Sequence, residues 1–281
     1  MSFSSDVKNE LSKINNLKNK DEVYAEFLGY LVSANTNINE KNNTIKFSTE
    51  NEYNINRFAK LLKNLNIDDY KINIVGKTFY IELKDKEEKS KISIEDIEEI
   101  LNSDNLKKAY IRGNFLGAGS INNPKNKYHL EFIFKDKECA EFSIKILKEF
   151  NINMKILEKT LYIKEGEEIS NFLALIGANS AVLKFEEIRV LREMKNNVNR
   201  IVNCETANLN RTINTAVKQI EIIKRLKESG KFNKLPKDLK EIANLREEKP
   251  DATLEELGKM LENPIGKSSV SNRFKRIEEY L

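Results

Sequence analysis

An internal duplication within residues 1–180 constrains the fold of this chain most strongly. One unit spans residues 22–85 and the other 108–165, and each begins with a helix-like apolar run, EVYAEFLGYLVSANTNI in the first and KKAYIRGNFLGAGSI in the second. In both units a strand, an amphipathic helix and two further strands follow, which predicts the order α-β-α-β-β with room for one more strand. Two ordinary α+β stretches could share this order by chance, but the paired TNI and GSI endings favour a true repeat. We therefore predict an α+β domain over residues 22–180, in which the two units pack about a pseudo-two-fold axis.

The flanking and connecting segments read as mainly helical. Residues 1–21 form an N-terminal helical segment, and the charge-rich residues 85–104 form a connector with one short helix. Residues 181–231 form an Asn-rich helical linker. Because Asn is a poor helix former and a good cap, we expect at least one break within 195–212. Beyond it, apolar residues at three- and four-residue steps predict one apolar helical stripe: Leu209, Ile213, Ala216, Ile220, Ile223 and Leu226.

Residues 232–281 read as an all-α domain of three helices. Pro236 suits the first turn of the first helix. Thr253 and Glu256 have the spacing of a capping box at the start of the second, whose apolar face would consist of Leu254, Leu257, Met260 and Leu261. The NPIG stretch at 263–266 is a turn. In the third helix, Val270, Phe274 and Ile277 fall on one buried face.

Two helices joined by a short Gly-containing turn, with a basic second helix, have the plan of a helix-turn-helix. The stretch 267–276 carries four positive side chains and no acid. Arg and Asn can bond to base edges, whereas Ser and Lys suit phosphates. We therefore predict binding to double-stranded DNA through Lys267, Ser268, Ser269, Ser271, Asn272, Arg273, Lys275 and Arg276. A three-helix interaction domain with a solvated basic face is the alternative.

The net charge of +4 is unevenly distributed along the chain. Residues 1–180 carry 27 Lys and Arg against 28 Asp and Glu, residues 181–231 carry 11 against 6, and residues 232–281 carry 10 against 10. The positive excess is therefore confined to the linker. DNA attracts clustered positive charge, so Lys and Arg of 189–231 can add phosphate attraction to the locally basic helix. A solvated basic helix would show the same excess.

Several kinds of chemistry are disfavoured by composition. The single histidine, His129, lies in the strand-like stretch YHLEFIF, which favours a structural or surface role. It cannot build a His-based zinc site with Cys139 and Cys204, and two cysteines are too few for a disulfide framework. No apolar run is long enough to span a membrane, and the polar start does not resemble a signal peptide. We expect a cytoplasmic protein.

The ends of the two apolar runs resemble degenerate LAGLIDADG motifs, LGYLVSANT at 28–36 and IRGNFLGAG at 111–119. Homing endonucleases of this fold carry an acid at the eighth motif position of each helix, and the two acids hold metal ions for phosphodiester cleavage. Those positions are Asn35 and Ala118 here, and neither can act as an anionic oxygen ligand. The resemblance therefore implies a LAGLIDADG-like domain without catalytic residues, metal or cofactor, and argues against an active nuclease.

Nearly the whole chain resembles the WhiA family of bacterial sporulation and cell-division regulators. The match is carried by four stretches, at 111–132, 194–212, 235–261 and 266–280. The resemblance implies a non-catalytic, nucleoid-associated transcriptional regulator of cell division, chromosome segregation or sporulation that binds DNA mainly through its helix-turn-helix. The alternative is an architectural or scaffolding protein whose LAGLIDADG-like domain binds a protein partner.

Overall fold

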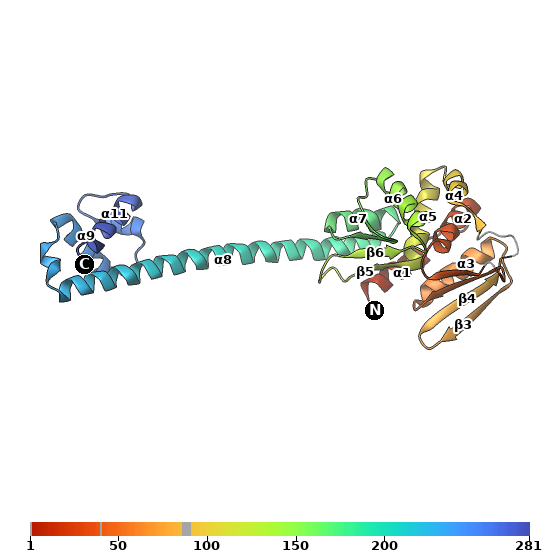
Figure 1. The fold of residues 1–281 in the computed structure, drawn as a ribbon, viewed down its shortest axis with the longest axis horizontal. Helices are drawn as coiled ribbons and strands as arrows, with labels where there is room; N and C mark the ends of the chain where they lie inside the picture. Colours follow the sequence, from red (N-terminus) through yellow and green to blue (C-terminus); the bar gives the residue numbers. More distant parts are fainter. Residues whose placement is uncertain (1, 40, 86–90) are drawn as a thin grey trace. The chain divides into compact units, whose positions relative to one another are not determined.

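The computed structural model describes residues 2–39, 41–85 and 91–281. It contains two compact units: the first ends at Glu193 and the second begins at Met194 (Figure 1). The first unit opens with α1 (Phe3–Ser12), whose N-terminus is capped by the Ser2 side chain. Phe3, Val7 and Leu11 lie one turn apart on α1 and are all buried. This segment therefore packs into the core of the first unit.

The two repeats have the same order of elements, α-β-β-α-β-β. The first consists of α2 (Lys20–Leu31), β1 (Thr36–Asn39), β2 (Thr44–Thr49), α3 (Glu52–Asn64), β3 (Tyr70–Val75) and β4 (Thr78–Lys84). The second consists of α5 (Asp104–Ala118), β5 (Gly119–Ile121), β6 (Leu130–Ile133), α6 (Lys137–Glu149), β7 (Lys155–Leu157) and β8 (Thr160–Ile163). The short helix α4 (Ile94–Ile100) precedes α5, and α7 (Gly166–Leu175) follows β8.

The extra strand of each repeat is the TNI or GSI ending that the sequence joined to the preceding helix. β1 pairs with β2, with Thr36 opposite Phe47, and β5 pairs with β6, with Gly119 opposite Phe132. All pairs are antiparallel, and the strand orders β1-β2-β4-β3 and β5-β6-β8-β7 correspond. The duplication therefore extends to the sheets.

The helices α2 and α5 that open the two repeats pack against each other at glycines. A Cβ on Gly113 would lie 2.0 Å from the carbonyl oxygen of Glu26, and a Cβ on Gly29 would lie 2.2 Å from that of Tyr110. Only a residue without a side chain allows this approach. The reciprocal contacts make Gly29 equivalent to Gly113 and Glu26 equivalent to Tyr110 in the two halves.

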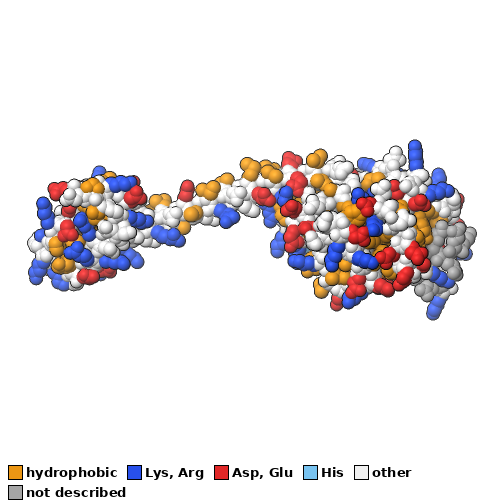
Figure 2. Space-filling model, turned by 90° about the horizontal axis from the view of Figure 1, so that it is seen from above, with side chains coloured by type: hydrophobic (Ala, Val, Ile, Leu, Met, Phe, Trp, Pro, Cys, Tyr) orange, Lys and Arg blue, Asp and Glu red, His pale blue; other side chains and the backbone are white. Residues whose placement is uncertain are grey.

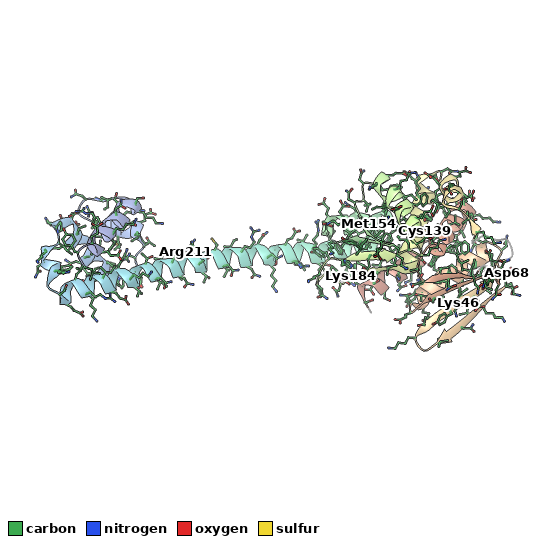
Figure 3. The ribbon with its side chains drawn as sticks, viewed as in Figure 1. Lys46, Asp68, Cys139, Met154, Lys184 and Arg211 are labelled. Atoms are coloured by element: carbon green, nitrogen blue, oxygen red, sulfur yellow. The ribbon has the colours of Figure 1, made fainter. Side chains whose placement is uncertain are left out.

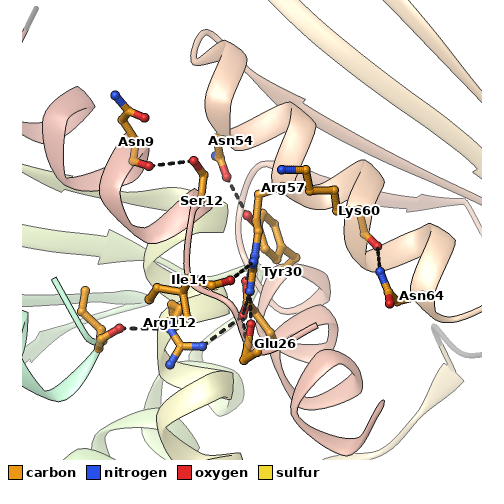
Figure 4. A network of polar contacts seen from close by, with 12 residues as sticks. Asn9, Ser12, Ile14, Glu26, Tyr30, Asn54, Arg57, Lys60, Asn64 and Arg112 are labelled. Carbon is orange, nitrogen blue, oxygen red and sulfur yellow. Dashed lines mark hydrogen bonds and ion pairs between the residues drawn. The ribbon is translucent and has the colours of Figure 1, made fainter. Parts of the chain in front are cut away.

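A buried network of charges crosses this helix pair (Figure 4). Glu26 Oε1 accepts a hydrogen bond from Arg57 Nε at 2.7 Å, and Glu26 Oε2 accepts from Arg57 Nη2 at 2.8 Å and Arg112 Nη1 at 3.1 Å. Arg57 Nη1 also donates to the Ile14 carbonyl oxygen, and Arg112 Nε donates to that of Ile176. One carboxylate thus joins the two repeats to the segments after α1 and α7.

The helix α8 (Asn179–Glu228) is continuous, so the expected break within 195–212 is wrong. Within this helix the Thr212 hydroxyl donates to the Asn208 carbonyl oxygen, one turn earlier, at 3.1 Å. The predicted apolar stripe is only partly correct. Ala216, Ile223 and Leu226 are buried, whereas Leu209 and Ile213 are exposed. Figure 2 shows exposed hydrophobic side chains along α8. Among the described residues, no helix combines the length and apolarity needed to cross a membrane.

The second unit packs three helices against the end of α8. After Gly230, which has a φ of +73°, come the 3-10 helix η2 (Lys231–Lys234), α9 (Lys237–Glu248), α10 (Leu254–Met260) and α11 (Lys267–Glu278). Their core contains Leu239, Ile242, Leu257 and Phe274, together with Ile223 and Leu226 of α8. Pro236 is the N-cap of α9 and not its first residue. Met260, predicted to lie on the apolar face of the second helix, is the last residue of α10 and is 52% exposed.

Candidate nucleic-acid interface

Local hydrogen bonds hold both the start of α10 and the turn between α10 and α11. Thr253 Oγ1 accepts the backbone N–H of Glu256, and the Glu256 side chain accepts that of Thr253, which completes the predicted capping box. After α10, the Ile265 N–H donates to the Gly258 carbonyl oxygen at 3.0 Å. A Cβ on Gly258 would lie 2.2 Å from the Ile265 carbonyl oxygen. The close passage of this loop fixes where α11 begins.

Arg246 of α9 contacts several segments around this turn. It was not identified from the sequence. Arg246 is buried, with 1% of its surface exposed. Its Nε donates to the side-chain oxygen of Gln219 at 3.0 Å, and its Nη1 donates to the carbonyl oxygens of Pro250 at 3.2 Å and Ala252 at 2.6 Å. Its guanidinium also lies 5.8 Å from the centre of the Phe274 ring. One side chain therefore connects α8, α9, the loop before α10, and α11.

The helix α11 buries one face and exposes the other. Val270, Phe274 and Ile277 are buried, as predicted. Lys267, Ser268, Ser269, Asn272, Lys275 and Arg276 are exposed, whereas Ser271 and Arg273 are half-buried. With 3.6 residues per turn, Ser268, Asn272 and Lys275 lie directly opposite the buried face. Glu279 continues this stripe just beyond the helix, so its positive part ends near Lys275.

Two of the predicted contact residues are already engaged within the unit. Arg273 Nε lies 3.7 Å and Arg276 Nη1 lies 3.6 Å from Asp238 Oδ2, and Arg273 Nη1 also donates to the Asp238 carbonyl oxygen at 3.4 Å. Exposed pairs of this length are weak, so a phosphate can compete with Asp238 for either arginine. Arg273 nevertheless lies at the flank of α11, toward α9. Asn272 is therefore more fully exposed on the outer face of α11 than Arg273.

A cavity of about 290 Å³ lies beside the N-terminal end of α11. Arg211, Thr212 and Thr215 of α8 line it together with Arg246, Lys267 and the start of α10. Glu255 also lines it, but its carboxylate lies 2.8 Å from Lys259 Nζ, which lowers the pKa of Glu255. Arg211, labelled in Figure 3, is therefore brought next to Lys267 although 56 positions separate them in the sequence. This agrees with the expectation that the linker adds positive charge.

The two residues predicted at the eighth motif positions lie at the ends of the motif segments in the first unit. Asn35 and Ala118 each directly precede the first strand of their repeat, β1 and β5. The Asn35 side-chain amide donates to the Gly117 carbonyl oxygen at 2.9 Å, which links the ends of the two motif segments. Among the described residues, no three His, Cys, Asp or Glu side chains are grouped to hold a metal ion. His129 is a partly exposed surface residue, with Nε2 2.9 Å from Glu131.

Comparisons with known proteins cover the whole chain. Residues 198–281 match the family model described as the WhiA C-terminal HTH domain, residues 107–195 match the WhiA LAGLIDADG-like domain, and residues 22–108 match a LAGLIDADG-like domain. A probable cell division protein WhiA from Clostridium tetani is 41% identical, over 99% of this chain and 96% of that protein. One from Thermoanaerobacter sp. is 40% identical, over 99% and 96%.

Solved structures give the same result. A crystal structure of full-length DUF199/WhiA from Thermatoga maritima has a TM-score of 0.63 and 30% sequence identity, over 99% of this chain and 97% of that one. The N-terminal LAGLIDADG domain of DUF199/WhiA has a TM-score of 0.56 and 29% identity, over 63% and 90%.

Proposed function

Since this chain belongs to the WhiA family, we propose that it binds double-stranded DNA through α11 and acts in bacterial cell division. The observation that carries the proposal is the exposed stripe of Ser268, Asn272 and Lys275 on a helix fixed by a buried core. A rigid helix with amide, hydroxyl and ammonium groups on its outer face suits the major groove. The names of the relatives support the cell-division role.

Finer roles belong to the same proposal. We infer a transcriptional regulator acting on the nucleoid, with effects on chromosome segregation or sporulation. In this proposal, Asn272 reads base edges, whereas Lys267, Ser268, Ser269, Ser271 and Lys275 bind phosphates, and Arg273 and Arg276 join them when a phosphate displaces Asp238. Arg211 supports an additional phosphate contact, because it shares a cavity with Lys267.

The protein is proposed to act without cleaving DNA. Asn35 and Ala118 offer no carboxylate at the ends of the motif segments, and the Asn35 amide is used to join those ends. Mg²⁺ and Mn²⁺ sites for phosphodiester cleavage depend on carboxylate oxygens. Incubation of supercoiled plasmid with the full chain and Mg²⁺ tests this proposal, and nicking that a single substitution abolishes would overturn it.

The base-reading role of Asn272 is tested with the full chain on genomic DNA. Mapping of bound sites by footprinting supplies a specific duplex, and Asn272→Ala should weaken binding to it by about 1–3 kcal/mol while changing affinity for random duplex less. Asn244→Ala is the matched control, because Asn244 is an exposed residue of the same type on α9. Equal losses on both duplexes would refute base reading and leave only phosphate contact.

An architectural role with a protein partner is the second candidate, and one observation favours it. Ile72 and Ile74 of β3 are 48% and 64% exposed, and Leu157 of β7 in the other repeat is 66% exposed. Exposed apolar groups on a sheet suit a protein contact better than a polyanion. Genome-wide mapping distinguishes the candidates: discrete sites support the regulator, and uniform coverage supports the architectural role.

A further inference from the structure

A polar cavity of about 460 Å³ lies in the first unit, beside the end of the first motif segment. The start of α1 lines it with Ser2, Ser4, Ser5 and Lys8, and Asn35, Thr78 and residues 48–51 complete the lining. We call it the serine cavity. Binding of DNA by α11 makes no use of it, and its volume falls in the range of small-molecule sites, roughly 300–1,000 Å³.

Three serine side chains line this cavity, and the oxygen of each accepts a hydrogen bond from the protein. Ser2 Oγ accepts the Ser5 N–H at 3.2 Å, Ser4 Oγ accepts the Ile121 N–H at 3.4 Å, and Ser5 Oγ accepts from Asn51 Nδ2 at 3.0 Å. Each oxygen is therefore held by a protein donor. No acceptor takes up its own hydrogen among the residues that the structure describes. A hydroxyl in this state donates to what enters the cavity, so the cavity selects for an acceptor.

Lys8 adds a positive charge that forms no ion pair with any residue in the described ranges. Within the described ranges, no carboxylate or hydrogen-bond acceptor contacts its Nζ, which lies 6.0 Å from the centre of the Phe115 ring. Burial lowers the pKa of Lys8 to about 8, because the desolvated ammonium has no partner. The acidic side chain in the cavity wall is Glu50, which is exposed and makes no ion pair with Lys8. The N-terminus of the ten-residue α1 adds its free amides and the positive end of its dipole.

We propose that the serine cavity binds the phosphate group of a phosphorylated ligand. A phosphate presents several anionic acceptor oxygens in a tetrahedron, which matches three hydroxyls, the amides of a helix N-terminus and one ammonium. The cavity is larger than a bare phosphate, so there is room for an attached group such as a nucleoside.

The test follows the reactivity of Lys8 in the full chain. Acetic anhydride acylates the neutral amine, and mass spectrometry of the Lys8 peptide gives the rate between pH 7 and 9. Saturating pyrophosphate should raise the pKa of Lys8 by at least about one unit and slow its acylation at pH 7.5 about fivefold to tenfold. Acylation of the exposed Lys13 on the same segment should not change. Because this measurement uses the unmodified chain, it needs no variant to fold.

Calorimetric titration of variants with pyrophosphate provides an independent readout. Lys8→Met should abolish binding, Lys8→Arg should keep it, and the control Lys13→Met should bind as the original chain does. Equal binding by Lys8→Met and the original chain would overturn the proposal. A mononucleotide and a short DNA duplex, used in the acylation assay, then distinguish a free phosphorylated ligand from a DNA backbone. The absence of protection by pyrophosphate, mononucleotide and duplex alike would also overturn it, without bearing on DNA binding by α11.

Discussion

Replacement of Glu26 by Gln should destabilise the first unit more than the loss of a carboxylate that pairs with a single cation. The substitution keeps the shape but removes the charge that two buried guanidinium groups share, those of Arg57 and Arg112. The NH2 group of the new glutamine side chain would also face N–H groups of the arginine guanidinium groups, so donor would meet donor. Because Arg57 is 1% exposed and Arg112 8%, water cannot replace the lost acceptor. Loss of one partner of a buried ion pair costs about 3–5 kcal/mol.

Thermal and urea unfolding of the full chain, followed by circular dichroism, measure this effect. For a unit of this size, about 2–4 °C accompanies each kcal/mol, so the transition of the first unit should fall by roughly 6–20 °C. Glu131→Gln is the control, since its carboxylate pairs at the surface with His129 and should cost less than about 1 kcal/mol. DNA binding by the second unit should be retained at low temperature.

The refuting result is a loss below about 1 kcal/mol for Glu26→Gln, or a loss equal to that of Glu131→Gln. Either outcome would mean that the two arginines find other acceptors, such as the Ile14 and Ile176 carbonyl oxygens that they already contact. A double variant sharpens the test. Glu26→Gln combined with Arg57→Gln should cost less than the two single losses added together, because contacting residues are not independent.

Three further outcomes follow from local geometry. Gly113→Ala should lower the melting temperature of the first unit, because the new Cβ would lie 2.0 Å from the Glu26 carbonyl oxygen. Overpacking of this kind costs about 1–3 kcal/mol. An unchanged melting temperature would contradict this backbone contact. Arg246→Met should destabilise the second unit by about 2 kcal/mol. Amide hydrogen exchange in α9–α11 measures this loss, and undiminished protection of these amides would contradict it. At pH 8, iodoacetamide should alkylate the exposed Cys204 and spare the buried Cys139. The reason is that burial raises the pKa of the Cys139 thiol to about 12. Equal labelling of both cysteines in peptide mass spectra would contradict this prediction.

The duplication and the helix-turn-helix were predictable because both depend on periodic burial. Val270, Phe274 and Ile277 repeat at helical spacing, and that spacing alone identifies the inner face of α11. The strands β1 and β5 were harder to identify, since they have four and three residues and directly continue apolar helical runs. Pairing with β2 and β6 makes them strands, and such pairing cannot be read from a short segment by itself.

The continuous α8 shows where local propensity fails. Asn-rich segments favour caps and turns in isolation, but propensity is a weak prior that a long helix can override. Two buried charged side chains were also not identified from the sequence. Glu26 and Arg112 each interrupt an apolar run, and a charge inside a buried stripe was the available signal. Their partnership could not be deduced, because it depends on the pairing of helices 86 positions apart.

The shared carboxylate makes the two halves of the first unit non-interchangeable. Tyr110 occupies in the second half the place that Glu26 has in the first, so the charges are distributed unequally over a symmetric backbone. Two second halves facing each other would enclose two copies of Arg112 with no Glu26 to accept from them, which is a costly arrangement. The two halves therefore carry different side chains at equivalent backbone positions, and this difference favours the pairing of a first half with a second half over the pairing of two identical halves.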